Sequence, residues 1–424
     1  MEIISSYNLI IEFSVILILS FLFNGISKRT NIPAVLMLIG LGILLQYLLQ
    51  SFTNETFDFF PILEVLGIVG LIMIVLEAAL ELELKQEKLL PILKSFAVAL
   101  IGLLGSAWAA VWILMTFVPD MTTESAWLYA TPLSILSSAI IIPSVGTLNY
   151  KKREFHIYEG TFSDILGIMM FYFLTGKLNP AQDSGVVGFG GNLLLTIAIS
   201  LIASYGIILI FQNIKSQVKL FLLIALLLLL YAIGKKMHLS SLIIILIFGL
   251  VIANMKLFFR GRLSKWLHFE KAHQIYHELH TITAETAFVV RTFFFVIFGL
   301  TITVASLFDL QVAIISSLII LSIYLIRFLI LMVFEGKDML PQLFIAPRGL
   351  ITVLLFYAIP VEVQIEGFEP GILLFVIIGT SVIMTFAMIY DKKRSNKAIE
   401  QASSRKVSSV KWKVPSVIDQ EEKK

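Results

Sequence analysis

Four side chains within the apolar runs of this chain carry oxygen atoms of the kind that hard cations prefer. Asp164 lies about one helical turn inside one run, directly after Ser163, and Ser137 and Ser138 lie within an earlier run. Carboxylate and hydroxyl oxygens, together with backbone carbonyls freed at a helix break, would bind a monovalent cation. A carboxylate held away from water also favours its protonated form. These residues therefore predict a site at which a proton and a cation compete for Asp164.

One further acidic residue directly precedes this run, and three arginines that could pair with a carboxylate lie in later runs. Glu159 precedes Asp164 by five residues, and Arg291, Arg327 and Arg348 lie in later runs. Buried charges persist mainly when they are paired, so a structural ion pair with an arginine is the alternative role for Asp164. Arg348 would either neutralise helix ends at a break or extend to the surface. Arg291 would either line the boundary between the core and the dimerisation part of the protein or anchor the membrane interface.

The composition places these charges in a membrane. Of the 424 residues, 58% are hydrophobic and 14% are charged, whereas about a quarter of the residues are charged in ordinary soluble proteins. Successive long apolar runs exclude a disordered chain, a fibrous chain and an ordinary cytosolic enzyme. The net charge of +3 gives no support to nucleic-acid binding. The absence of cysteine excludes disulfides, thiolate metal sites and thiol catalysis.

About thirteen apolar runs predict helical spans rather than short alternating strands. They cover residues 8–26, 32–50, 61–80, 90–118, 127–149, 160–176, 190–212, 218–234, 239–254, 286–306, 311–334, 343–360 and 371–390. The first run has no basic segment before it and is interpreted as a span, not as a signal peptide. An odd number of spans puts the termini on opposite sides, and nearly all Lys and Arg residues between the runs then fall on one side. The positive-inside rule predicts an outside N-terminus and a cytoplasmic C-terminus.

Two of the runs contain helix breakers near their middles. One extends from Ser134 to Pro143 and includes three serines, and the other extends from Pro341 through Pro347-Arg348-Gly349. Proline removes a backbone donor and glycine weakens a helix. Broken helices at membrane depth occur beside protein or a water-filled cavity, and a pair of them in corresponding positions points to a transporter site. The pattern predicts an inverted repeat of spans 4–6 against spans 11–13.

Several segments over roughly residues 8–390 resemble the monovalent cation/proton antiporter superfamily, and its sodium/proton exchanger branch most of all. The matching segments are the basic–Ile–Pro segment at 28–35, the acidic segment at 76–84, Glu159 through Asp164, the aromatic–Gly segment at 294–300, Arg327 and Pro347-Arg348-Gly349. The chain departs from the family at two positions. Ser163 stands where the family has Asn, and Ser137 stands where the family's broken fifth span has Asp.

The resemblance implies an all-α polytopic membrane protein with inverted repeats and two crossed broken helices, as in sodium/proton antiporters. It implies a moving core formed by spans at about 90–176 and 311–390, a fixed dimerisation scaffold and a homodimer. It also implies that Asp164 binds the cation and the proton alternately, and that Glu159 pairs with Arg327. Buried charges survive mainly in such pairs, so this core ion pair is expected to be structural.

The remaining charged groups have less specific interpretations. Three histidines share one face of an amphipathic helix predicted over 255–285 on the inner surface. They are His273, His277 and His280. Their spacing would suit a cytoplasmic pH sensor or a metal site, and such residues often have no role. Three glutamates precede an inner loop and are expected at a solvated helix end. They are Glu77, Glu81 and Glu83.

A transmembrane domain is predicted over 1–390, and a disordered cytoplasmic tail is predicted over 391–424, which is polar and has no apolar period. We expect no enzyme activity, no cofactor and no bound metal, because no phosphate-binding glycine loop, Ser–His–Asp set or pair of intramembrane aspartates is visible. The expected function is antiport of protons against a monovalent cation, Na⁺ first and K⁺ or Li⁺ next, in an inner or plasma membrane. The alternatives are a transport-silent or regulatory protein with this fold and a carrier of another solute, such as an organic anion.

Overall fold

The computed structural model describes residues 6–30, 32–52, 60–82, 84, 86–178, 185–214, 219–236, 241–259, 266, 268–301, 304–336, 338–365 and 368–404. Within these ranges the chain forms helices and short connections and no β-strand, as the sequence predicts. The α-helices are α1 (Ser6–Thr30), α2 (Ala34–Phe52), α3 (Phe60–Glu81), α4 (Leu89–Phe117), α5 (Thr123–Ser134), α6 (Ser138–Ser144), α7 (Tyr150–Lys177), α8 (Gly185–Phe211), α9 (Lys219–Lys236), α10 (Ser241–Ala253), α11 (Met255–Phe258), α12 (Phe269–Thr301), α13 (Leu310–Phe334), α14 (Leu350–Tyr357) and α15 (Gly371–Ser404).

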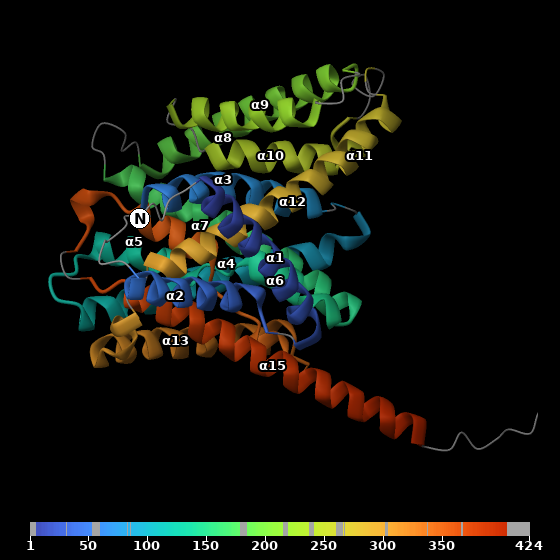
Figure 1. Ribbon diagram of the computed structural model, residues 1–424. Coiled ribbons are helices and arrows are strands. Elements are labelled where there is room, and N and C mark those ends of the chain that lie inside the picture. Colours follow the sequence, from blue (N-terminus) through green and yellow to red (C-terminus); the bar gives the residue numbers. More distant parts are fainter. Residues whose placement is uncertain are drawn as a thin grey trace, which may run out of the picture.

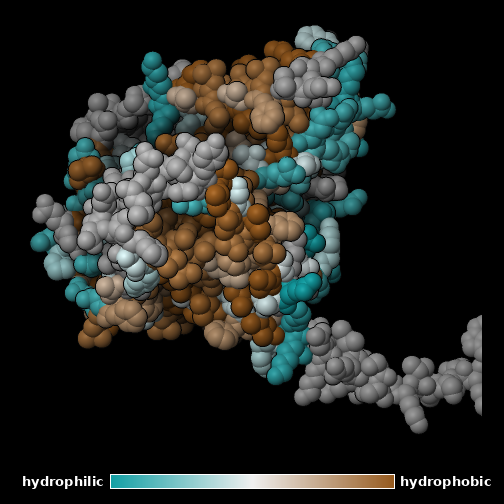
Figure 2. Space-filling view, viewed as in Figure 1, coloured by the Kyte–Doolittle hydropathy of each residue, from teal (hydrophilic) through white to brown (hydrophobic). Residues whose placement is uncertain are grey.

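The described part of the chain makes thirteen membrane crossings, as the apolar runs predict. The helices α5 and α6 form one interrupted span, the segment from Pro341 through α14 forms another, and α11 is a short link. Among the described residues, eight spans are long and apolar enough to cross a bilayer by themselves, with α5 and α6 counted together as one of them. Hydrophobic side chains form a broad band from the top to the bottom of the face in Figure 2, and hydrophilic ones gather along its left and right sides. The protein is therefore a multi-pass membrane protein.

Two groups of helices pack within this bundle. In the core group (α4–α7 and α13–α15), α4 packs against α5, α7 and α13, and α13 packs against α15. In the scaffold group (α1–α3 and α8–α12), α12 packs against α2 and α3, and α10 packs against α3, α8 and α9. In Figure 1, α8–α10 lie on one side of the bundle, and α13 and α15 lie on the other. The order of helix, broken helix and helix occurs twice in the core group, which confirms the predicted repeat.

The two broken spans meet at their breaks. Ile135–Ser137 separate α5 from α6, and Ile345–Gly349 precede α14. The Ser137 backbone N–H donates to the Pro347 carbonyl at 2.9 Å, so each break supplies a hydrogen-bond partner to the other. The first break lies before Pro143, which instead lies inside α6. A proline removes one helical hydrogen bond, whereas the break is stabilised by several partners from other helices.

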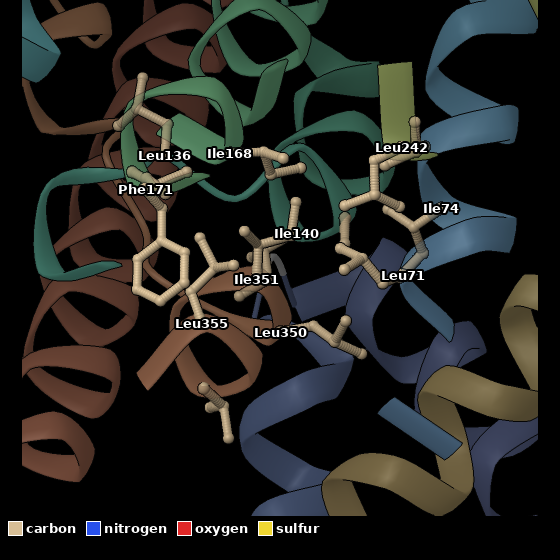
Figure 3. Close-up of a cluster of buried hydrophobic side chains, with 14 of the residues drawn as sticks. Leu71, Ile74, Leu136, Ile140, Ile168, Phe171, Leu242, Leu350, Ile351 and Leu355 are labelled. Carbon is tan, nitrogen blue, oxygen red and sulfur yellow. The ribbon is translucent and has the colours of Figure 1, made fainter. Parts of the chain in front are cut away.

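Apolar side chains fill the space around the crossing (Figure 3). Those labelled in the figure come from α3, the first break, α6, α7, α10 and α14, and all of them are buried: Leu71, Ile74, Leu136, Ile140, Ile168, Phe171, Leu242, Leu350, Ile351 and Leu355. Because this surrounding is apolar, each polar group at the crossing has to find its partner within the protein or lose hydrogen-bond energy.

Gly349 allows the two breaks to approach this closely. A Cβ built on Gly349 would lie 2.5 Å from the Ser137 hydroxyl oxygen and 3.0 Å from the Ser137 Cβ. We expect Gly349→Ala to lower the free energy of unfolding by about 1–3 kcal/mol, because overpacking forces the two segments apart. Thermal unfolding in detergent measures this change. Gly146→Ala is the control, since no described atom lies within 4 Å of a Cβ built there. Equal losses in the two variants would contradict the close-packing argument.

Two helices extend beyond their predicted boundaries. From Phe269 to Thr301, α12 is one helix, so the part of the predicted amphipathic segment at 269–285 continues directly into the span predicted to begin at 286. The prediction of one helix over 255–285 is wrong at its start, because Met255–Phe258 form the separate α11, and 260–265 and 267 lie outside the described residues. The helix α15 continues to Ser404, so the prediction of disorder from residue 391 is wrong for 391–404. In both cases a helix is already formed, and extending it through Lys, Glu, Gln and Ala residues is easier than nucleating a new one. The rest of the predicted tail, 405–424, lies outside the described residues.

Candidate functional site

Asp164 lies on α7 beside the first break. It is 3% exposed, and the Ser138 hydroxyl at the start of α6 donates a hydrogen bond to its Oδ2. The other carboxylate oxygen, Oδ1, is buried and has no hydrogen-bond partner among the described residues. The three arginines considered as partners in the sequence analysis all bond to other groups. The structure therefore does not place Asp164 in an ion pair with any of them.

Two of the three predicted serine ligands contact the backbone of the breaks. The Ser163 hydroxyl accepts a hydrogen bond from the Leu136 N–H at 2.9 Å. Ser137 stands at the N-cap of α6 and donates its backbone N–H to Pro347. Ser138 is thus the serine that the structure brings to the Asp164 carboxylate. Ser163 and Ser137 hold the break in place beside it.

Glu159 and Arg327 form a two-point ion pair that joins α7 to α13. Arg327 donates from Nη1 to Glu159 Oε1 at 2.6 Å and from Nη2 to Glu159 Oε2 at 2.9 Å. Arg327 Nε and Nη2 also donate to the Gln342 carbonyl, at 3.1 and 3.0 Å. The two paired side chains are 1% and 8% exposed. Such a desolvated, two-point contact fixes the relative orientation of the two helices as well as their separation.

His156 adds a third buried side chain to this ion pair through a contact with Glu159. This histidine was not identified from the sequence. Its side chain is fully buried, and its Nδ1 lies 3.1 Å from Glu159 Oε2. Because the carboxylate is the acceptor, Nδ1 carries the proton in this contact. His156 Nε2 has no partner in the described part of the chain. The spacing of three residues, which puts two side chains on one helical face, was the available signal.

Arg348 lies inside the protein and binds the end of α5. Its Nε donates to the Leu133 carbonyl at 3.0 Å, its Nη2 to the Ser134 carbonyl at 3.2 Å and its Nη1 to the Ala346 carbonyl at 2.6 Å. The residue is 1% exposed, so it does not extend to the membrane surface. A cation at this position compensates the negative end of the α5 dipole and the carbonyls that the break leaves unpaired.

Arg291 on α12 bonds to two other helices. Its Nη1 donates to the Ala139 carbonyl of α6 at 2.9 Å, and its Nη2 lies 3.3 Å from Glu77 Oε2 of α3. The expectation of a solvated helix end is therefore wrong for Glu77, because α12 packs over this part of α3. Glu81 contacts His280 at 3.1 Å. Glu83 lies outside the described residues.

The three histidines of α12 do not converge on one point. His273 and His277 approach through their Nε2 atoms at 3.0 Å, whereas His280 contacts Glu81. The described residues contain no group of three or more histidine or acidic side chains that could hold a metal ion. The amphipathic face predicted from the sequence is present, but its histidines are divided between two contacts.

A cavity of about 240 Å³ adjoins the first break on one side of Asp164. Its wall includes Ser138, which is buried and bonds to Asp164, together with Glu77 and Arg291. The wall continues to Ser27 and Ser144, which are partly exposed. The cavity is therefore a partly polar route between the first turn of α6 and one end of the bundle.

Comparison with known proteins agrees with this architecture. The chain matches the family described as sodium/hydrogen exchanger, transmembrane, over residues 15–389. A structure of the sodium proton antiporter MjNhaP1 from Methanocaldococcus jannaschii at pH 8 has a TM-score of 0.66 and 19% identity, covering 91% of this chain and 99% of that chain. An electron-microscopy structure of the same antiporter has a TM-score of 0.66 and 18% identity, covering 95% and 99%. No curated protein sequence matches the chain. Because the family match spans most of the residues that form the thirteen crossings and both breaks, this chain belongs to the sodium/hydrogen exchanger family.

Proposed function

We propose that this protein is a secondary antiporter that exchanges protons for a monovalent cation, with Na⁺ as the first candidate and K⁺ and Li⁺ as the others. The observation that carries the proposal is the environment of Asp164, a buried carboxylate at the crossing of two broken helices. One of its oxygens has no hydrogen-bond partner among the described residues. Burial penalises the bare carboxylate charge, so either a proton or a cation stabilises this site.

Exchange follows from competition at this single carboxylate. A proton has to leave Asp164 before a cation binds, and the cation has to leave before a proton returns. Movement of the empty, charged site across the membrane is opposed, because an unpaired buried charge is costly. The two fluxes are therefore coupled if the site crosses only when it is neutralised. One carboxylate gives an exchange of one proton per cation.

Alternating access would come from movement of the core group relative to the scaffold group. The core group contains Asp164 and both breaks, and the scaffold group contributes α1, α2, α3 and α12 to the cavity wall. The wall ends near Pro33 and Ser144, at the end of the bundle that the positive-inside rule assigns to the cytoplasm. In this orientation the N-terminus is outside, the C-terminus is cytoplasmic and the cavity faces the cytoplasm. The scaffold group would form the homodimer contact in an inner or plasma membrane.

Proton flux in proteoliposomes tests the proposal. A pH gradient is imposed, Na⁺, Li⁺ or K⁺ is added in turn, and a pH-sensitive dye follows the gradient. Collapse of the gradient on addition of one of these cations, without dependence on membrane potential, is the expected result. No response to any cation from correctly inserted protein would contradict antiport and favour a transport-silent protein. Potential-driven flux would contradict the exchange of one proton per cation.

An organic-anion carrier has weaker support. Such a carrier would be expected to present arginine side chains or helix N-termini to its substrate. Arg291, Arg327 and Arg348 each donate to carbonyl or carboxylate groups of the protein itself. These contacts favour a structural role for the three guanidinium groups. Asp164 is then the charged group of the site that is available to a ligand.

Ser138→Ala is expected to weaken cation binding without abolishing exchange. The substitution removes the hydroxyl that bonds to Asp164 Oδ2, and a hydrogen bond to a charged group contributes about 1.5–3 kcal/mol. The cation concentration for half-maximal flux at fixed pH should rise roughly tenfold or more. Ser144→Ala is the matched control, because the Ser144 hydroxyl lines the same cavity but bonds to the Ile140 carbonyl within α6. An equal change in both variants would contradict the specific contact with Asp164.

A further inference from the structure

A proline in α6 leaves one backbone carbonyl without its helical donor, and another helix binds that carbonyl. Pro143 has no N–H to donate to the carbonyl of Ala139, four residues earlier. Arg291 on α12 donates from Nη1 to this carbonyl at 2.9 Å. The sequence of α6 therefore creates the acceptor that Arg291 occupies.

Glu77 holds the same guanidinium group from a third helix. Its Oε2 lies 3.3 Å from Arg291 Nη2, and the two side chains are only 21% and 15% exposed. The helices α3 and α12, which carry Glu77 and Arg291, pack together in the scaffold group, whereas α6 packs against α7 in the core group. The contact from Glu77 through Arg291 to Ala139 is thus a polar link across the boundary between the two groups.

The boundary between α3 and α14 is, in contrast, apolar and closely packed. A Cβ built on Gly67 would lie 2.1 Å from a methyl carbon of Leu354, and one built on Gly70 would lie 3.9 Å from Leu350. Apolar contacts have no directional preference, whereas the bond from the guanidinium to the carbonyl requires a particular geometry. The Arg291 bond therefore favours one position of the core group relative to the scaffold group. The apolar contacts alone would tolerate a wider range of positions.

We propose that Arg291 is a positioning residue that latches the core group to the scaffold group in the conformation described here. Ala139 directly follows Ser138, which bonds to Asp164, so the latch holds the turn of α6 that contacts the carboxylate. This inference rests on the proposed alternating access. For Asp164 to face the other side, Arg291 has to release the Ala139 carbonyl, and the contact between α3 and α14 has to open. Arg291 Nε has no partner among the described residues, so the latched guanidinium is not fully satisfied.

Cysteine labelling can test the latch, because the chain contains no cysteine of its own. One reporter is Leu350→Cys, at a fully buried position of α14 on the apolar boundary, and the other is Asn24→Cys, in the cavity wall. Each reporter is combined with Arg291→Gln, with Pro143→Ala, or with the control Arg153→Gln at an exposed position of α7. The rate of reaction with a charged thiol reagent is measured on the purified protein in detergent.

The latch predicts faster labelling at only one of the two reporters. Arg291→Gln should accelerate labelling of the Leu350→Cys reporter at least about fivefold, because losing a hydrogen bond to a charged group shifts a two-state equilibrium by that factor or more. Labelling of the Asn24→Cys reporter should become slower or stay the same. Pro143→Ala gives the Ala139 carbonyl a backbone donor inside α6. It should therefore also accelerate labelling of the Leu350→Cys reporter, by a smaller factor than Arg291→Gln does. Arg153→Gln should leave both rates unchanged.

Two outcomes would overturn the latch. Equal acceleration at both reporters would mean that Arg291 supports the structure generally, and unchanged labelling of the Leu350→Cys reporter would mean that it does not restrain the boundary. Labelling needs no transport, so the two proposals can fail separately. A shift in labelling by a protein without proton flux would support the latch and contradict antiport. Flux without a shift in labelling would contradict the latch alone.

Discussion

Replacing Asp164 by asparagine is expected to abolish proton-coupled cation flux while leaving the protein folded. An amide has nearly the same shape as a carboxyl group and keeps an acceptor oxygen for the Ser138 hydroxyl. It carries no negative charge for a cation and takes up no proton near neutral pH, so neither half of the exchange remains. Dye-monitored flux in proteoliposomes should fall to the rate of protein-free vesicles for every cation.

Asp338→Asn is the matched control for this substitution. Asp338 pairs with Lys152 at the surface, and its side chain is 80% exposed, so the same chemical change there should leave flux unaltered. Asp164→Asn should unfold at or above the wild-type temperature, because a neutral group is buried more easily than a charged one. Wild-type flux in this variant would contradict the role of Asp164. Loss of folding would instead indicate that the carboxylate is structural.

Removing one partner of the Glu159–Arg327 pair is expected to cause a large loss of stability. Arg327→Met leaves the Glu159 carboxylate buried without its guanidinium partner, and breaking such a pair costs about 3–5 kcal/mol. The double variant with Glu159→Leu should lose less than the sum of the two single variants, because no unpaired charge remains. Unfolding of all four proteins, followed by heat or denaturant, completes the double-mutant cycle.

Lys94→Met provides the comparison, at a more exposed ion pair that also involves α13. Lys94 of α4 pairs with Glu335 at the end of α13 at 3.0 Å, but the side chains are 32% and 20% exposed. Partly solvated pairs contribute about 1 kcal/mol or less, so this loss should be several times smaller. Strictly additive losses in the Glu159 and Arg327 cycle would contradict the view that these two groups stabilise each other.

Local composition was sufficient to predict the spans and the carboxylate. Thirteen crossings follow from runs of apolar residues, and Asp164 stands out because a charge within such a run is costly. The pairing of Glu159 with Arg327 joins residues far apart in the chain, and it was implied by resemblance to a family rather than by any local pattern. The family match and the paired geometry agree with that implication.

Roles that depend on packing between distant helices were not predictable from one sequence. Glu77 lies near the end of α3 and resembles a solvated residue until α12 brings Arg291 over it. The sequence left two positions open for Arg291, the boundary of the core and the membrane interface. Its hydrogen bond to the Ala139 carbonyl of α6 puts it at the boundary of the core group. His156 lies before the apolar run of α7, and its burial results from the packing of α7 against helices such as α4 and α5, which no local pattern indicates.

The bond that ties the two breaks together uses the Ser137 N–H and the Pro347 carbonyl, and no side-chain atom. Every residue except proline supplies that N–H, and every residue supplies that carbonyl. Evolution can therefore exchange the side chain at position 137 while the two segments remain crossed. Serine stands there in this chain, where the family segment that it resembles has aspartate. The crossing of the two breaks therefore depends on the backbone at position 137 and not on a polar group of the side chain there.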